Sequence, residues 1–330
     1  MRKYIIRRLL YAALILFFVS FLIYFLMRNL PMSYVEQKAM QLAQSPGSQY
    51  SYGEWVDRLG AVYGLNKGIV PGFLSWWGNM LQGNFGDSWY YNMPVLQKFS
   101  QVIPDSMWLA FTVMILQYVI YIPLGILAAR KQYSTTDYVI TVLAMIGISL
   151  PLFFVITMFK LVFAVYLGWF DLYGKVGRNF PFLSPWGQFW DIVKHYILPV
   201  AAATLVSIGG GMRMTRTNML EVLQSDYIRT ARAKGLPERQ VVYRHAFRNT
   251  LVILVTGLGS ILPGLFSGFL TTEILFQIPG IGYTSYSAIL QGDIPFTMFF
   301  LVFMSFLILM GTLISDILYA AADPRIRIAS

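Results

Sequence analysis

Residues 9–27 read LLYAALILFFVSFLIYFLM, an uncharged stretch that lies between Arg8 and Arg28. A transmembrane helix needs about 20 mostly apolar residues to cross the roughly 30 Å hydrocarbon core. Because a central charged residue costs roughly 2.5–3.5 kcal/mol on insertion scales, uncharged intervals of this length mark candidate spans. The basic start MRKYIIRR could also introduce a cleaved signal peptide, but the RNLPMSYVEQ that follows offers no small-x-small cleavage site. We therefore expect residues 9–27 to be retained as a membrane anchor.

Similar intervals recur along the chain and predict the fold. A weaker one, residues 196–212, is followed by Arg213 and Arg216. A helix over this interval alone would be only about 26 Å long. We therefore expect the helix to continue beyond the bilayer towards Leu223. The other four intervals are bounded by Asp105 and Arg130, Asp137 and Lys160, Arg248 and Glu273, and Asp293 and Asp316. The pattern predicts an all-α polytopic membrane protein with six transmembrane helices.

The composition supports this class and excludes several others. The 330 residues are 57% hydrophobic and 12% charged, with a mean hydropathy of +0.59, whereas soluble chains are about 25% charged. Without cysteine there is no disulfide framework and no thiolate nucleophile or metal site. His195 and His245 are too few for a histidine metal centre. We find no pair of buried carboxylates, no Ser/His/Asp set and no GxxxxGK[ST] loop, so we expect no catalytic site and no ATP hydrolysis by this chain itself.

The basic residues indicate the orientation. Alternate segments, 1–8, 128–138, 213–248 and 316–330, hold 16 of the 25 Lys and Arg residues and 6 of the 15 acidic ones. The whole net charge of +10 therefore lies on one side of the predicted membrane, which the positive-inside rule makes the cytoplasmic side. Both termini are expected there. A nucleic-acid-binding protein would also have a positive net charge, but nucleic-acid binding would not place the excess of Lys and Arg on alternate loops.

The spans divide the chain into three segments. Residues 1–30 form the N-terminal tail and first anchor, 31–101 a small extracytoplasmic segment, and 102–330 a transmembrane domain with the cytoplasmic loop 213–248. In the outer segment LSWWGNMLQ has helical spacing and residues 83–86 indicate a turn. Its aromatic residues suit the headgroup level, or the segment is a docking surface for an extracytoplasmic partner. The second outer loop, 166–195, is interrupted by glycines and prolines.

The cytoplasmic loop 213–248 has clear helix boundaries. Asp226 can cap a short helix that begins at Tyr227, and Gly235 can end it. Pro237 suits the first turn of a second helix, and Glu238 is favourable at its positive end.

The short helix is amphipathic. An apolar patch made by Tyr227, Ile228, Ala231 and Leu236 is surrounded by Arg229, Arg232 and Lys234. Such a helix can lie on anionic lipid or insert into a groove of a partner subunit.

This loop carries a resemblance to a known family. Residues 226–251, DYIRTARAKGLPERQVVYRHAFRNTL, resemble the Glu-Ala-Ala loop of the first permease subunit of the oligopeptide/dipeptide/nickel group of binding-protein-dependent ABC importers. The triplet aligns with Arg229, Thr230 and Ala231, so the acidic first residue is absent, as is usual for the peptide group. Residues 64–89, residues 268–295 and the terminal DPRIR also resemble the family's segments, so the match extends over essentially the whole chain.

The resemblance assigns roles to individual residues. In this family the short helix is the coupling helix, which sits in a cleft of the cytoplasmic ATPase. The residues that the resemblance singles out are, for the coupling helix, Asp226, Tyr227, Ile228, Arg229, Thr230, Ala231, Arg232, Ala233, Lys234 and Gly235; for the return helix, Arg244, His245 and Asn249; and for an outer motif, Glu273, Phe276, Pro279, Gly280, Gly282 and Asp293. The substrate-binding residues are not indicated.

The resemblance also implies a fold, a function and partners. It implies a type I ABC importer permease fold in a bacterial or archaeal cytoplasmic membrane and a pore subunit for oligopeptides or dipeptides. The expected partners are a second homologous permease, two cytoplasmic ATPases that bind ATP and Mg, an extracytoplasmic solute-binding protein and membrane lipid, with no nucleic acid and no cofactor on this chain. A nickel chelate or an oligosaccharide is an alternative cargo.

Two other classes make different demands on the sequence. A secondary transporter needs intramembrane ionisable residues, and the second, fifth and sixth intervals contain none at mid-depth. A membrane enzyme needs the catalytic set that is absent.

Some single residues have two interpretations. Glu273 is a structural residue near a re-entrant segment or a proton relay, and we favour the first. Pro263 and Gly264 mark a kink or an unwound binding helix, and we favour a kink. We expect kinks at Pro123 and around Ser149–Pro151, and an interfacial position for His195.

Overall fold

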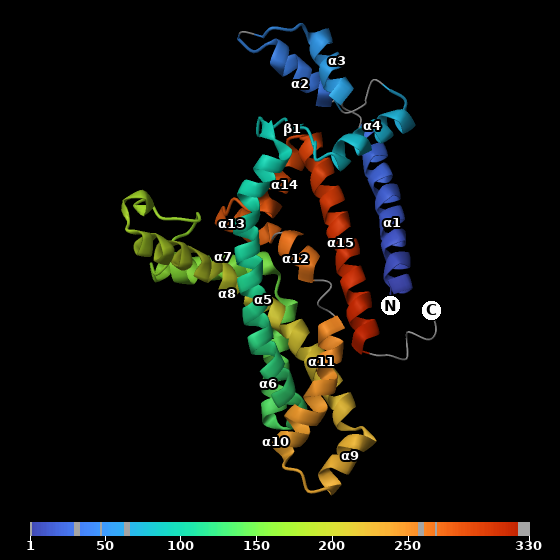
Figure 1. Ribbon diagram of the computed structural model, residues 1–330. Coiled ribbons are helices and arrows are strands. Elements are labelled where there is room, and N and C mark those ends of the chain that lie inside the picture. Colours follow the sequence, from blue (N-terminus) through green and yellow to red (C-terminus); the bar gives the residue numbers. More distant parts are fainter. Residues whose placement is uncertain are drawn as a thin grey trace. The chain divides into compact units, whose positions relative to one another are not determined.

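The computed structural model describes residues 2–29, 34–46, 48–62, 67–256, 261–267 and 269–322 (Figure 1). Nearly all of the secondary structure in these ranges is helical. The chain forms two compact units, one of Met1–Pro104 with Thr284–Leu313, the other of Asp105–Tyr283 with Ile314–Ser330. This division follows packing, whereas the segments 1–30, 31–101 and 102–330 concern the side of the membrane and stay a prediction.

The first unit contains the N-terminal helix and the predicted outer segment. The expected helix at LSWWGNMLQ and the turn at residues 83–86 are both confirmed, with Gly83 and Gly86 at positive φ. A small core of aromatic side chains, including Tyr24, Phe73 and Trp76, joins α1 to α4. Its elements are α1 (Arg2–Arg28), α2 (Tyr34–Ala43), α3 (Tyr52–Val62), α4 (Ile69–Leu81), and the antiparallel strands β1 (Asp87–Ser88) and β2 (Met93–Pro94).

The second unit is built mainly from long helices. Three helices, α5, α14 and α15, have residues in both units. In chain order the remaining elements are α5 (Val95–Arg130), α6 (Thr135–Ser149), α7 (Leu152–Phe159), the π-helix η1 (Lys160–Tyr166), the 3-10 helix η2 (Phe180–Phe182), α8 (Pro185–Leu223), α9 (Asp226–Ala233), α10 (Glu238–Gln240), the π-helix η3 (Val241–Ala246), α11 (Phe247–Thr256), α12 (Ile261–Ser267), α13 (Leu270–Phe276), α14 (Ile281–Leu290) and α15 (Ile294–Ala322).

The helices fit a polytopic membrane protein. Within the described residues, four helices are long and apolar enough to cross a membrane, in α1, α5, α8 and α15. A fifth span results if α6 counts as one span with α7 and η1, although the two parts are bent by 98° at the Ser149–Pro151 break. Pro151 explains this break, because a proline disfavours helical backbone in the residue before it. The bend is far sharper than the kink expected there, whereas α5 continues through Pro123.

The fourth and fifth predicted spans have different outcomes. Helix α8 ends at Leu223, as expected, and its 39 residues extend about 58 Å. It begins at Pro185, so the last third of the outer loop expected at residues 166–195 belongs to α8, with Ser184 as the N-cap. The fifth interval contains α11 and α12, and residues 257–260 between them lie outside the described ranges. Pro263 and Gly264 lie inside the short helix α12.

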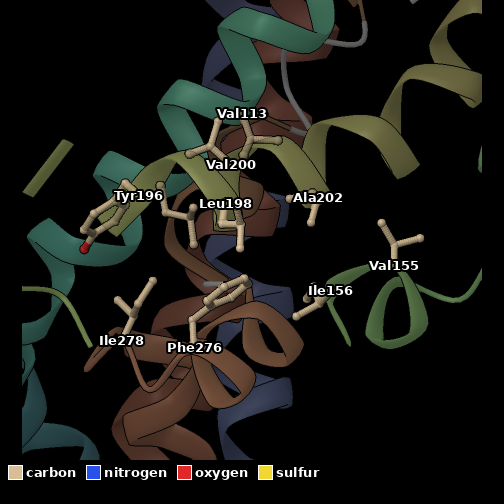
Figure 2. Close-up of a cluster of buried hydrophobic side chains, with 11 residues drawn as sticks. Val113, Val155, Ile156, Tyr196, Leu198, Val200, Ala202, Phe276 and Ile278 are labelled. Atoms are coloured by element: carbon tan, nitrogen blue, oxygen red, sulfur yellow. The ribbon is translucent and has the colours of Figure 1, made fainter. Parts of the chain in front are cut away.

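The core of the second unit forms where four helices meet (Figure 2). Val113 of α5 lies beside Val200 of α8, and Phe276 at the end of α13 points towards Leu198. Between helices in a membrane, such contacts stabilise the fold through close van der Waals packing. The cluster therefore attaches the short helix α13 to the long helices of the unit.

Three consecutive glycines allow α8 to approach its neighbours closely. A Cβ atom at Gly209 would meet the backbone of α6 at Ala144, and one at Gly211 would meet the ring of Tyr121 on α5, whereas nothing lies within 4 Å at Gly210. Small residues permit such close helix packing in membranes.

Candidate functional site

The coupling-helix candidate is helix α9, and its ends are defined by the neighbouring residues. Ser225, not Asp226, occupies the N-cap position, and Asp226 is the first helical residue, where its charge still suits the positive end. The N-cap therefore lies at Ser225, one residue before the position predicted from the sequence. Gly235 has φ +75°, and the N–H of Leu236 donates to the carbonyl of Ala231. A left-handed glycine therefore ends the helix, as predicted.

The two faces of α9 have opposite environments. Ile228 is 0% exposed and Ala231 is 6% exposed, and both pack within the chain's own core. Their neighbours are Val241, Val242 and Ala246 of η3, Met219 of α8, and Ile126 and Ala129 of α5. This overturns the expectation that the whole apolar patch faces lipid or a partner, because Ile228 and Ala231 are covered by this chain itself.

The turn after α9 is held by an exposed ion pair. Arg232 donates two hydrogen bonds to the carboxylate of Glu238, at 2.8 and 3.2 Å. The Arg232 guanidinium lowers the pKa of Glu238, against the smaller opposing effect of its partial burial. Since both side chains are more than 40% exposed, solvent screens this pair and it contributes at most about 1 kcal/mol.

The return segment contacts α9 through a polar side chain. Asn249 donates a hydrogen bond to the hydroxyl of Tyr227 at 3.0 Å and another to the carbonyl of His245. Arg244 is exposed and His245 is half-buried. The segment begins at Glu238 as α10 and passes through the π-helix η3, which the sequence pattern did not predict, before it becomes α11. Asn249 thus connects the two arms of the loop.

The C-terminal part of α8 has an ion pair that sequence reasoning missed. Arg216 donates to both oxygens of Asp137 on α6, each at 2.7 Å. Asp137 is buried and also accepts from the N–H of Tyr133. Such a two-pronged pair fixes both position and orientation. Arg216, which interrupts the fourth uncharged interval, is thus paired inside the unit.

The outer motif is organised around Glu273, which is 0% exposed. Its carboxylate accepts from the Ser106 hydroxyl at 2.6 Å, from the N–H of Phe269 at 3.2 Å and from the N–H of Tyr283 at 2.8 Å. Ser106 in turn accepts from the N–H of Ile281 at 2.6 Å. A buried carboxyl group is tolerated when several hydrogen-bond donors satisfy it in this way. These contacts are those of a structural anchor.

The glycines of the motif leave room for this carboxylate. A Cβ at Gly280 would lie 2.5 Å from the Ser106 hydroxyl oxygen and 2.6 Å from Oε1 of Glu273, and one at Gly282 would lie 3.0 Å from Oε2. Phe276 belongs to the core cluster, whereas Pro279 is exposed. The structure therefore brings Glu273, Gly280 and Gly282 together at one corner of the second unit.

Two further contacts hold the end of α13. Lys160 donates to the carbonyl of Leu275 at 2.7 Å, and its ammonium lies 3.7 Å from the ring centroid of Tyr173. The N–H of Gly174 donates to the carbonyl of Phe276 at 2.8 Å. These groups satisfy carbonyls that a helix end leaves free. No local pattern in the sequence pairs residue 160 with 275, so sequence reasoning could not find them.

Asp293 of the outer motif belongs to the first unit. It accepts from the hydroxyl of Ser88, from the N–H groups of Trp89 and Tyr90, each at 3.2 Å, and from the N–H of Phe296 at 3.3 Å. The last contact makes it the N-cap of α15. Asp293 thus fixes the β1–β2 hairpin to the start of α15.

Three buried polar groups of the second unit are Asp105, Glu273 and His195. Asp105 and Glu273 are both carboxylates, and each is held by partners of its own. Asp105 forms an ion pair with Lys175 at 2.5 Å and accepts from the hydroxyl of Tyr196 at 3.4 Å. His195, expected at an interface, is also buried, and its Nδ1 lies 2.7 Å from the carbonyl oxygen of Asp191.

Comparison with known proteins places this architecture in a family. Residues 121–328 match the family model described as the binding-protein-dependent transport system inner membrane component. The oligopeptide transport system permease protein AppB of Bacillus subtilis is 36% identical over 328 residues, which cover 99% of each chain. The dipeptide transport system permease protein DppB of Lactococcus lactis is 34% identical and is covered over its whole length, with 99% of this chain.

A third relative has a differently named cargo. The peptidoglycan transport system permease protein YejB of Agrobacterium fabrum is 33% identical over 283 residues, which cover 85% of this chain and 78% of that protein. The resemblance to ABC importer permeases is therefore confirmed at full length. The chain belongs to the family of inner membrane components of binding-protein-dependent transport systems, and it is a multi-pass helical permease of the cytoplasmic membrane.

Proposed function

We propose that this permease forms half of the pore of an ATP-driven importer for peptides. The observation that carries the proposal is the full-length similarity to permeases named for oligopeptide and dipeptide transport, at 36% and 34% identity. The relative named for peptidoglycan transport makes cell-wall fragments the second candidate cargo.

The membrane topology belongs to the proposal. The chain crosses the membrane six times, with both termini and the loop 213–248 in the cytoplasm and residues 31–101 outside. This topology puts the whole net charge of +10 on the inner side, as the positive-inside rule requires. Since the chain has no cysteine, single cysteines can report the side. Gln49→Cys should react with an impermeant maleimide on intact cells, and Gln240→Cys, also at an exposed position, should react only after the cells are opened. The reverse pattern would refute the topology.

The proposed partners are a second permease, two cytoplasmic ATPases and an extracytoplasmic binding protein. Helix α9 is the part of this chain that we assign to the ATPase contact, with ATP and Mg held by those partners. Because Ile228 belongs to the same buried cluster as Met219 of α8 and Ile126 of α5, a displacement of α9 can be passed through this cluster to two long helices. Rigid-body rocking of such a block can convert an outward-open cavity into an inward-open one.

Reconstitution of the four components with the cognate binding protein tests the function. Liposomes that contain the complex should take up a labelled oligopeptide only in the presence of ATP and the binding protein. A dipeptide, a muropeptide fragment and a nickel chelate are tested as alternative substrates under the same conditions. Transport of the muropeptide without the oligopeptide would replace the first cargo with the second, and uptake without ATP would refute the importer.

A further inference from the structure

We propose that α9 is recognised through its charged face by an acidic surface of the ATPase. This inference rests on the proposed function, because it concerns how that same contact is made. It starts from the burial of Ile228 and Ala231, which are 0% and 6% exposed and pack against η3, α8 and α5. Two members of the apolar patch are therefore already packed inside the permease, whereas the ring of Tyr227 stays exposed.

The remaining surface of α9 is polar and cationic. Tyr227 keeps an exposed ring, but its hydroxyl is bonded to Asn249. Ala233 offers little apolar area. The residues of the helix and its cap that are exposed are Asp226, Tyr227, Arg229, Thr230, Arg232, Ala233 and Lys234. Three cations and one carboxylate thus dominate this face.

The cations differ in how firmly they are engaged within the chain. Arg232 is held by Glu238 in two hydrogen bonds. Arg229 lies 3.6 Å from Asp226, with both side chains more than 70% exposed, so their attraction is largely screened by water. Lys234 forms no ion pair with any carboxylate in the described part of the chain. Arg229 and Lys234 are therefore the cations that remain available to a partner.

This arrangement favours carboxylates as the recognising groups. Complementary charges across an interface steer association and select the partner, while like charges brought together cost several kcal/mol. A cleft lined by Asp and Glu of the ATPase provides that complement, and it gives an affinity that falls with ionic strength, since the Debye length is only about 8 Å at physiological salt. Anionic lipid headgroups have related chemistry, and the experiment separates them.

The test measures ATPase binding to the complete permease pair in nanodiscs. Arg229→Glu with Lys234→Glu should weaken binding about tenfold or more, because two attractive contacts become repulsive. Arg229→Gln with Lys234→Gln should give a smaller loss, and the wild-type affinity should fall between 50 and 300 mM salt. Lys131→Glu, an exposed cation in the turn after α5, is the matched control and should bind within about twofold of wild type.

Several results would overturn the inference. Unchanged binding by the double reversal, or a wild-type affinity independent of salt, would exclude recognition by charge. A loss confined to phosphatidylglycerol nanodiscs, and absent in phosphatidylcholine ones, would assign the charged face to lipid. If the wild-type permease pair fails to bind the ATPases at all, the proposed function is refuted, and this inference with it.

Discussion

The corner around Glu273 and the loop around α9 place their ionisable side chains in opposite environments. At the corner one carboxylate is fully buried and accepts three hydrogen bonds from side-chain and backbone donors. In the loop the charged groups lie on the surface, and the buried contacts are made by Ile228 and Ala231. A substitution at the corner should therefore destabilise the fold, whereas one on the charged face of α9 should alter partner binding and leave the fold intact.

Glu273→Ala should have the largest effect on stability. It leaves the Ser106 hydroxyl and the N–H groups of Phe269 and Tyr283 without their acceptor in a buried site, and each buried donor left unsatisfied costs roughly 1–3 kcal/mol. We expect a loss of about 3 kcal/mol or more in the free energy of unfolding. Intrinsic tryptophan fluorescence of the purified permease during heating measures it. A melting temperature equal to that of wild type would contradict the anchor role.

Gly280→Ala should destabilise by a smaller amount. Its methyl group would enter the space of Ser106 and Glu273, and overpacking of this kind typically costs 1–3 kcal/mol. Gly264→Ala in α12 is the matched control, because nothing lies within 4 Å of its Cβ, and it should be neutral or slightly stabilising. The same melting assay compares the two. Equal losses of stability in the two variants would show that the close contacts at Gly280 are not the reason for a glycine at this position.

Glu238→Gln should have the smallest effect, below about 1 kcal/mol, since its pair with Arg232 is exposed to solvent. The Arg232 guanidinium lowers the pKa of Glu238 in the folded protein. The pair therefore stabilises the fold at pH values above the ordinary glutamate pKa of about 4.3, and this contribution disappears as the pH falls through the lowered value. Melting curves at pH 7 and at acidic pH should show a small difference that vanishes in acid. A difference that grows in acid would give the wrong sign.

The sequence predicted the features that depend on local pattern. Uncharged intervals located α1, α5, α8 and α15, and a glycine with room for positive φ located the end of α9. These signals work because a membrane span and a helix end each depend on a few neighbouring residues.

Features that depend on pairing over long distances were not predictable. The contacts of Arg216 with Asp137 and of Lys160 with Leu275 join residues far apart in sequence. The same limit applies to α9, where periodicity identified an apolar patch but not what covers it. That patch packs against η3 and α8, so only the fold shows that Ile228 and Ala231 are closed to a partner.

The central claim is that the charged face of α9 contacts the ATPase while its apolar face belongs to the permease. Single cysteines test it directly in this cysteine-free chain. Arg229→Cys and Lys234→Cys should react rapidly with a maleimide in the permease pair alone and become strongly protected when the ATPases are bound. Tyr133→Cys, at an exposed position in the turn between α5 and α6, should react equally in both states. Equal reactivity of all three positions with and without bound ATPases would contradict the account.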